Sequence, residues 1–336
     1  MKSNKTKKLI IWFLKAAAAG CCAVLILCAV CLLYFNVPVH YENESGATGF
    51  RWEENRFYSR ATEGLAWGRT NNEGFNNLFD YHEGDRIDIL LMGTSHMDAM
   101  YVPQDETTAA RLNRLFEGER TVYNIAVSAH TLMHNLNNLE NALSYYEPEQ
   151  YVIIECNGVT ASNEELEAVL DNSYPNIQSR TGGLVTLLQK MPYLRLMYNK
   201  YMYGMFDDAQ EQTAVNTEED PENRELLEKV MAKAAQSAEK HGVKLIVMLD
   251  STVYIDENRS CYLDTDEKAV ETMAEICAEN GIEFIYASEM FLREVSENMR
   301  LPYGFANTEP GLGHLNSWGH ELLANCIYGR IAQMEG

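Results

Sequence analysis

Two side chains in this sequence, Ser95 and His314, could together carry out acyl transfer. A serine hydroxyl becomes a useful nucleophile when a base such as histidine lies within hydrogen-bond reach. The oxyanion that then develops needs donors, and the Ser95 N–H, an N–H near Ser128 and the side-chain amide of Asn157 could supply them. Each residue also has a purely structural interpretation: Ser95 in a turn that caps a helix, His314 at the start of a helix, and Asn157 as a loop cap.

These residues lie where the predicted secondary structure would bring them together. An apolar run over 87–92 ends at Gly93 and suits a strand buried on both faces of a parallel sheet. Strands and helices then alternate, with strands predicted at 121–125, 151–154, 244–249 and 283–286 and helices at 105–116, 134–146, 182–203, 222–241, 265–280 and 317–334. This alternation predicts an α/β protein, a three-layer sandwich around a five-stranded, mostly parallel sheet. The candidate residues should meet at the carboxyl edge of that sheet, because each follows a strand or precedes the last helix.

The amino terminus predicts a membrane anchor. Residues 16–35 form an uncharged, mostly apolar run of 20 residues, which 9–14 lengthen, and such a run can span a bilayer. The first 35 residues contain five lysines and no acidic residue, and the lysines precede the run. By the positive-inside rule, 1–8 should be a cytoplasmic tail, 9–35 a transmembrane signal anchor, and the remainder extracytoplasmic. A cleaved signal peptide is the rival interpretation, but no small-residue cleavage site closes the run near Asn36.

The rest of the chain divides into two predicted parts. Residues 36–84 are polar but rich in aromatic side chains, which favours a stalk followed by a segment that packs on the domain. Residues 85–336 form the predicted α/β domain, with a helical insertion at about 158–221, since that stretch is too long for a connection. The net charge of −22 argues against a nucleic-acid partner. Four cysteines lack zinc-ligand spacing and leave the disulfide pairing open: Cys156, Cys261, Cys277 and Cys326.

Several short motifs together resemble the SGNH/GDSL hydrolase superfamily. They are the sequence GTSH at 93–96, the Asn124–Ser128 segment, Asn157, and GHLN at 313–316 followed by Gly319. The likeness is closer to the membrane-anchored branch that contains the teichoic acid D-alanylation protein and the alginate-type O-acetyltransferases. It implies a flavodoxin-like SGNH hydrolase fold and a serine esterase or O-acyltransferase that acts on acyl esters of a cell-envelope glycan or teichoic-acid-type polymer. It also implies that no cofactor or metal is needed and that a multi-spanning acyltransferase is a partner.

The sequence departs from this family pattern beside the histidine. The aspartate that the family places three residues before it falls at Gly311, and Glu309 is then the candidate for an orienting acid. Loss of the orienting acid in a serine triad can lower the rate about 10⁴-fold. An alternative is therefore a catalytically degenerate domain that binds envelope glycan or a membrane acyltransferase. Three further residues are expected near the substrate: His96, Asp98 and Asn124.

Overall fold

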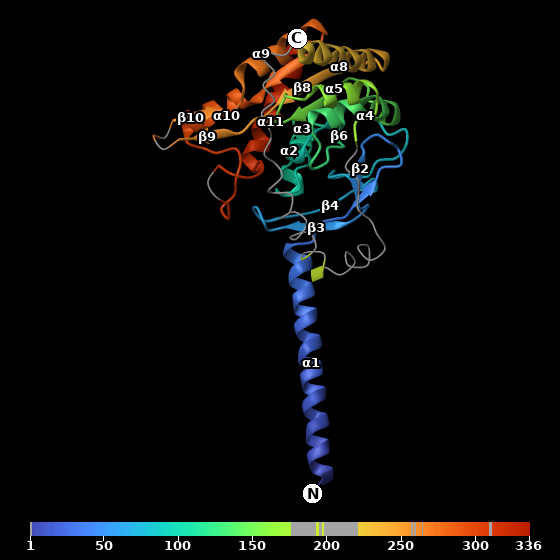
Figure 1. Ribbon diagram of the computed structural model, residues 1–336, viewed down its shortest axis with the longest axis vertical. Coiled ribbons are helices and arrows are strands. Elements are labelled where there is room, and N and C mark those ends of the chain that lie inside the picture. Colours follow the sequence, from blue (N-terminus) through green and yellow to red (C-terminus); the bar gives the residue numbers. More distant parts are fainter. Residues whose placement is uncertain are drawn as a thin grey trace. The chain divides into compact units, whose positions relative to one another are not determined.

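The computed structural model in Figure 1 describes residues 2–175, 193–194, 197, 221–256, 258, 260–263, 265–308 and 311–336. The chain divides into two units. The first contains helix α1 (Lys2–Tyr34), and the second begins at Pro38 and contains every strand of the described chain. Within α1, the stretch Lys7–Tyr34 has 28 residues, and its most apolar 18 residues have a mean hydropathy of 2.7 and are only 6% buried. At roughly 42 Å it exceeds the thickness of about 30 Å of a bilayer core, so its length and composition suit a membrane span or a signal sequence.

Five parallel strands form the central sheet of the second unit, as the sequence predicts. They are β5 (Ile89–Met92), β6 (Val122–Asn124), β7 (Tyr151–Cys156), β8 (Lys244–Leu249) and β11 (Glu283–Tyr286). Their order across the sheet is β11-β8-β7-β5-β6, and every neighbouring pair is parallel. Numbered along the chain, this is the 2-1-3-4-5 order of flavodoxin-like folds. The prediction of an α/β fold with such a sheet is confirmed.

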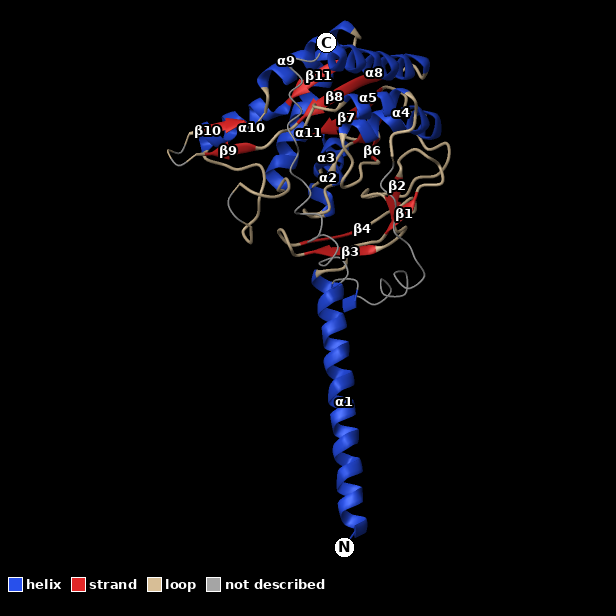
Figure 2. Ribbon diagram, viewed as in Figure 1, coloured by secondary structure: helices blue, strands red, loops and turns tan. Residues whose placement is uncertain are grey.

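Helices cover both faces of this sheet and make the three layers (Figure 2). One core lies under α4 (Leu132–Tyr146), α5 (Asn163–Leu170), α8 (Pro221–Lys240) and α9 (Glu267–Glu279). The other lies under α3 (Thr108–Leu115), α10 (Ala287–Asn298) and α11 (Ser317–Glu335). Strand β5 feeds both cores, because Leu90 and Met92 belong to the first and Ile89 and Leu91 to the second. This explains its unbroken apolar sequence.

Some elements differ from the prediction. Helix α10 was not predicted, and neither was the hairpin of β9 (Val253–Ile255) and β10 (Cys261–Leu263). The helix predicted over 182–203 lies outside the described residues apart from positions 193, 194 and 197. The four cysteines of this unit are free.

The segment after α1 contains two small hairpins. Strands β1 (His40–Glu42) and β2 (Phe50–Trp52) pair antiparallel, as do β3 (Phe57–Arg60) and β4 (Ala66–Arg69). With three or four residues each, they are too short to leave a periodic signal in the sequence. The segment also reaches the edge of the sheet: Asn77 accepts from the Asn124 N–H at 3.0 Å and donates to its carbonyl at 2.8 Å. The hairpins therefore belong to the α/β unit and lie close to the carboxyl end of β6.

Candidate active site

The candidate residues lie at the point where the order of the sheet reverses. Strand β5 has β6 on one side and β7 on the other, so successive crossovers leave β5 in opposite directions. In open α/β sheets, ligands bind outside the carboxyl ends of the strands at such a point. Strand β5 ends at Met92, and Ser95 lies shortly after this end. Strand β7 ends at Cys156, and Asn157 is the next residue.

A tight turn presents Ser95. Gly93 has no side chain because a Cβ there would lie 2.5 Å from Oε2 of Glu155. Thr94 then caps the single-turn helix α2 (Ser95–Asp98), its hydroxyl accepting from the His96 N–H at 3.2 Å. Ser95 is half-buried, whereas its neighbours from Gly93 to Asp98 are buried. It is therefore the most accessible residue of the turn.

His314 is held by a glutamate from the amino-terminal hairpins. Its Nδ1 atom and its backbone N–H each lie 2.9 Å from Oε2 of Glu63, which stands between β3 and β4. The ring of Tyr101 stacks on the imidazole, with 3.8 Å between centroids and 15° between planes. Arg60 in turn lies over Tyr101, with its guanidinium carbon 4.9 Å from the ring centroid. These contacts fix both the plane of the imidazole and the nitrogen that faces the carboxylate.

The pair of His314 and Glu63 has the electrostatics of a triad base and its orienting acid. Burial lowers the pKa of His314, and the hydrogen bond and charge of Glu63 oppose that shift. Burial raises the pKa of Glu63, but the hydrogen bonds from His314 outweigh it, and the pKa falls below its usual value. Near neutral pH, Glu63 is thus a carboxylate and His314 a neutral imidazole with its proton on Nδ1. The Nε2 atom is left as a proton acceptor.

The turn that carries Ser95 lies beside His314. The ring centroids of His96 and His314 are 5.9 Å apart and the rings meet edge to face. Since His96 directly follows Ser95, the two segments expected to hold the nucleophile and the base are neighbours at this edge of the sheet.

Glu63 is a candidate functional residue that was not predicted from the sequence. It precedes His314 by 251 residues and lies in the segment 36–84, which was predicted as a stalk and a part that packs on the domain, so no local pattern connects the two. The available signal was the glycine at position 311, where the family has an aspartate. This glycine indicated that another acid must orient His314. The predicted substitute, Glu309, lies outside the described residues.

Three of the other predicted site residues have structural partners instead. Asp98 is fully buried and accepts from the Trp52 indole at 3.1 Å and from the Ser128 N–H and hydroxyl at 3.2 and 2.6 Å. Ser128 is therefore not a free oxyanion donor, and Asp98 is not exposed to a substrate. Asn124 is also buried, and its side chain binds the Met97 carbonyl and the Ala126 N–H. The three residues thus hold the strand-end loops together, and their expected roles toward a substrate stay predictions.

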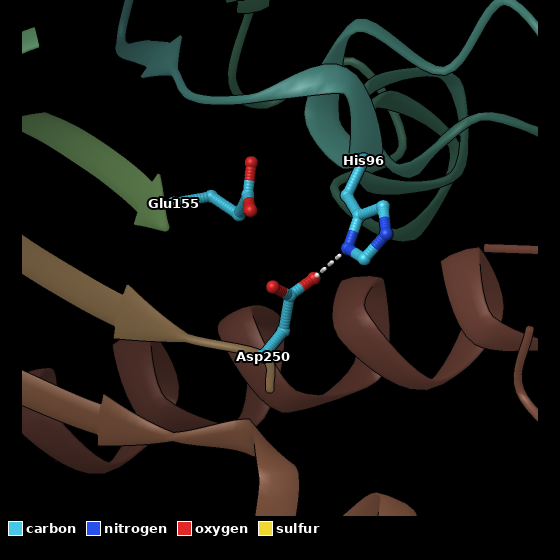
Figure 3. A group of neighbouring side chains, drawn as sticks. All are labelled: His96, Glu155 and Asp250. Atoms are coloured by element: carbon cyan, nitrogen blue, oxygen red, sulfur yellow. Dashed lines mark hydrogen bonds and ion pairs between the residues drawn. The ribbon is translucent and has the colours of Figure 1, made fainter. Parts of the chain in front are cut away.

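Asn157 and His96 lie near the turn in different surroundings. Asn157 follows β7 directly and is exposed. His96 is buried, and its Nδ1 atom lies 3.0 Å from Oδ2 of Asp250, the residue after β8. Figure 3 shows His96, Asp250 and Glu155 grouped where β5, β7 and β8 end. Their ligand atoms lie within 4.8 Å of one another, close enough to hold a metal ion.

Comparison with known proteins finds similarity only among solved structures. Neither a family model nor a curated protein matches the chain. The chain is similar to the psychrotrophic esterase EstA from Pseudoalteromonas sp. at 14% identity and a TM-score of 0.41, over 73% of this chain and 97% of that one. An acetylxylan esterase from Geobacillus stearothermophilus has 12% identity and a TM-score of 0.42, over 75% and 96%. A GDSL-like lipase from Bacteroides thetaiotaomicron has 15% identity and a TM-score of 0.38, over 73% and 88%. At this level of similarity, the argument for function rests on the site itself.

Proposed function

We propose that this chain is a membrane-anchored serine esterase or O-acyltransferase of the SGNH type. The observation that carries the proposal is the hydrogen bond of Glu63 to Nδ1 of His314, next to the turn of Ser95. A carboxylate on one ring nitrogen leaves the other free to take a proton from a serine hydroxyl, which is the arrangement of a catalytic triad. An enzyme is favoured over a degenerate domain because the orienting acid, absent at Gly311, is supplied by Glu63.

The chemistry follows from these three residues. Ser95 Oγ attacks the acyl carbon of an ester while Nε2 of His314 accepts its proton. The Glu63 carboxylate stabilises the resulting imidazolium and keeps the ring in the correct tautomer. The imidazolium then protonates the leaving alcohol, and an acyl-serine remains. Water or an acceptor hydroxyl releases the acyl group by the same steps in reverse. Of the predicted oxyanion donors, the N–H of Ser95 and the amide of Asn157 are retained in this proposal.

The place of action and the substrate class follow from the anchor and the motifs. An uncleaved α1 would hold the α/β unit on the extracytoplasmic side, because the lysines precede the apolar run. The esters within reach there are those of cell-envelope glycans or teichoic-acid-type polymers. A multi-spanning membrane acyltransferase is the proposed partner if the reaction is transfer. Retention of the full chain in carbonate-washed membranes, with the α/β unit labelled by an impermeant reagent from outside, tests this topology. Release of a shortened chain into the medium would contradict it.

Active-site labelling tests the catalytic proposal. A fluorophosphonate probe should label the full-length protein in detergent, and Ser95→Ala should abolish the labelling. The control Ser260→Ala, at an exposed position away from the site, should be labelled like the original protein. Hydrolysis of an aryl acetate should follow the same pattern.

A second candidate function is a domain that binds envelope glycan without catalysis. It is favoured by Ser128, whose N–H is occupied by Asp98 and so does not contribute to an oxyanion hole. Failure of both the probe and the aryl acetate to react with a folded protein would exclude the esterase and leave this alternative.

A further inference from the structure

Two buried carboxyl groups hold the residues on either side of Ser95. Glu155, the next-to-last residue of β7, accepts from the Thr94 N–H at 2.7 Å and from the Thr94 hydroxyl at 2.9 Å. Asp250, directly after β8, accepts from Nδ1 of His96 at 3.0 Å. Residues 94 and 96 are thus each tied to a different strand end, and Ser95 lies between the two ties.

Among the described residues, this pair of carboxyl groups has no lysine or arginine partner. Glu155 is 0% and Asp250 1% exposed, and within the described chain no lysine or arginine forms an ion pair with either. Two ionised carboxylates this close together in a protein interior would repel each other strongly without compensation. Burial accordingly raises the pKa of both groups: that of Glu155 to about 8, with the neighbouring Asp250 adding to the shift, and that of Asp250 well above its usual value.

One oxygen of the pair lacks a donor. Asp250 Oδ1 is buried and has no hydrogen-bond partner among the described residues, while Oδ2 faces His96. Figure 3 shows the carboxyl group of Glu155 on the side of Asp250 that faces away from His96. A single proton on Glu155 would supply the missing donor, remove one charge and leave Asp250 as the carboxylate that His96 requires.

We propose that Glu155 and Asp250 are positioning residues that share one proton and so hold Thr94 and His96 in the places that present Ser95 for attack. The role of Ser95 as nucleophile rests on the proposed function; the shared proton does not. The proton balance is complete: Glu155 donates to Asp250, Asp250 accepts from His96, and Glu155 accepts from the Thr94 N–H. The alternative is that a divalent cation, rather than a shared proton, lies between His96, Glu155 and Asp250. One nitrogen and two carboxylate oxygens suit zinc or manganese.

Amide and alanine substitutions in the full-length protein distinguish a shared proton from a bound cation. Glu155→Gln keeps a donor for Asp250 and an acceptor for the Thr94 N–H, so the rate of fluorophosphonate labelling should fall less than tenfold. Glu155→Ala and Asp250→Ala should each lower that rate and kcat for an aryl acetate at least a hundredfold, with KM changed less than threefold. If the alanine variants do not fold, Thr94→Val, which removes only the hydroxyl, should still slow labelling about tenfold.

A matched control is available at the other end of the same sheet. Asp88 is also fully buried, and it accepts from the Thr121 N–H at 2.7 Å before β5 begins. Asp88→Ala should lower Tm as the other alanine variants do but leave the labelling rate of the folded protein unchanged. This control distinguishes positioning of Ser95 from loss of stability.

Several results would overturn the inference. If Glu155→Gln is as slow as Glu155→Ala, or if one metal ion per chain is bound and is lost in Asp250→Ala, the proton does not hold the pair together. If the original protein is labelled and the alanine variants are labelled equally fast, the pair does not position Ser95, and only this inference fails. If the folded original protein is not labelled at all, the proposed function fails, and the positioning role fails with it.

Discussion

Replacing Glu63 by glutamine should remove the charge beside His314 while keeping the size of the side chain. With about 4 Å between the centres of an imidazolium and a carboxylate, their attraction is about 4 kcal/mol at an effective dielectric constant of about 20. The two side chains are 23% and 25% exposed, so solvent weakens this value, and about 2–4 kcal/mol is the reasonable range. The imidazolium forms only on the way to the transition state. Glu63→Gln should therefore lower kcat by roughly 30- to 1000-fold with little change in KM.

The pH profile of this variant is a second readout of the same contact. Glu63 raises the pKa of His314 against the lowering effect of burial, so its removal should let that pKa fall further. The acidic limb of kcat/KM, where the base becomes protonated, should move to lower pH. A loss of folding alone would not move this limb. The assay is aryl acetate hydrolysis between pH 4 and 9, with thermal melting to verify folding. A loss below threefold with an unmoved acidic limb would refute the role of Glu63.

The remaining predictions concern a neighbouring glycine and a buried histidine. Gly313→Ala should mimic the loss of Glu63, because a Cβ there would lie 2.5 Å from Glu63 Oε2; Gly311→Ala is the control, with the same positive φ region but no atom nearer than 3.6 Å. Equal kcat values for the two variants would argue against this. His130 should make the protein acid-sensitive, since burial, together with His134 and His40, lowers its pKa to about 3. In the unfolded chain, His130 binds a proton below about pH 6.5, whereas in the folded chain it stays neutral. The free energy of unfolding should therefore fall by about 1.4 kcal/mol per pH unit between about pH 6.5 and the pKa of the folded state. In urea unfolding, His130→Phe should lose about 2 kcal/mol less free energy of unfolding between pH 6.5 and 5 than the wild-type protein loses. Equal losses in the two proteins would contradict this role of His130.

The sheet could be predicted because its signal is local. The apolar runs that become β5, β7 and β8 are continuous, and glycines end the helices before β8 and β11. A continuous apolar run of this length has few alternatives to a strand buried on both faces, so the type of these elements and their places along the chain follow from the sequence. The hairpins of 36–84 leave no such signal, because strands of three or four residues carry no period.

The positions of the candidate site residues could be predicted where they follow from the ends of strands, but their side-chain partners could not. Ser95 and His314 came from their places beside a strand and a helix. Ser128 was assigned from its place as well, but the nearby carboxylate of Asp98 takes its N–H. Glu63, Glu155 and Asp250 were missed, because their roles arise from contacts between residues that are 61 to 251 positions apart. Such contacts exist only in the folded chain.

The candidate site residues are synthesised in the order in which they occur along the chain, beginning with Glu63 in the amino-terminal hairpin. The acid leaves the ribosome first, the serine about thirty residues later, and the histidine only near the end of translation. A chain interrupted between Ser95 and His314 would therefore carry the proposed nucleophile without its base. Because Glu63 and His314 come from opposite ends of the α/β unit, the proposed triad is complete only once the whole unit has folded.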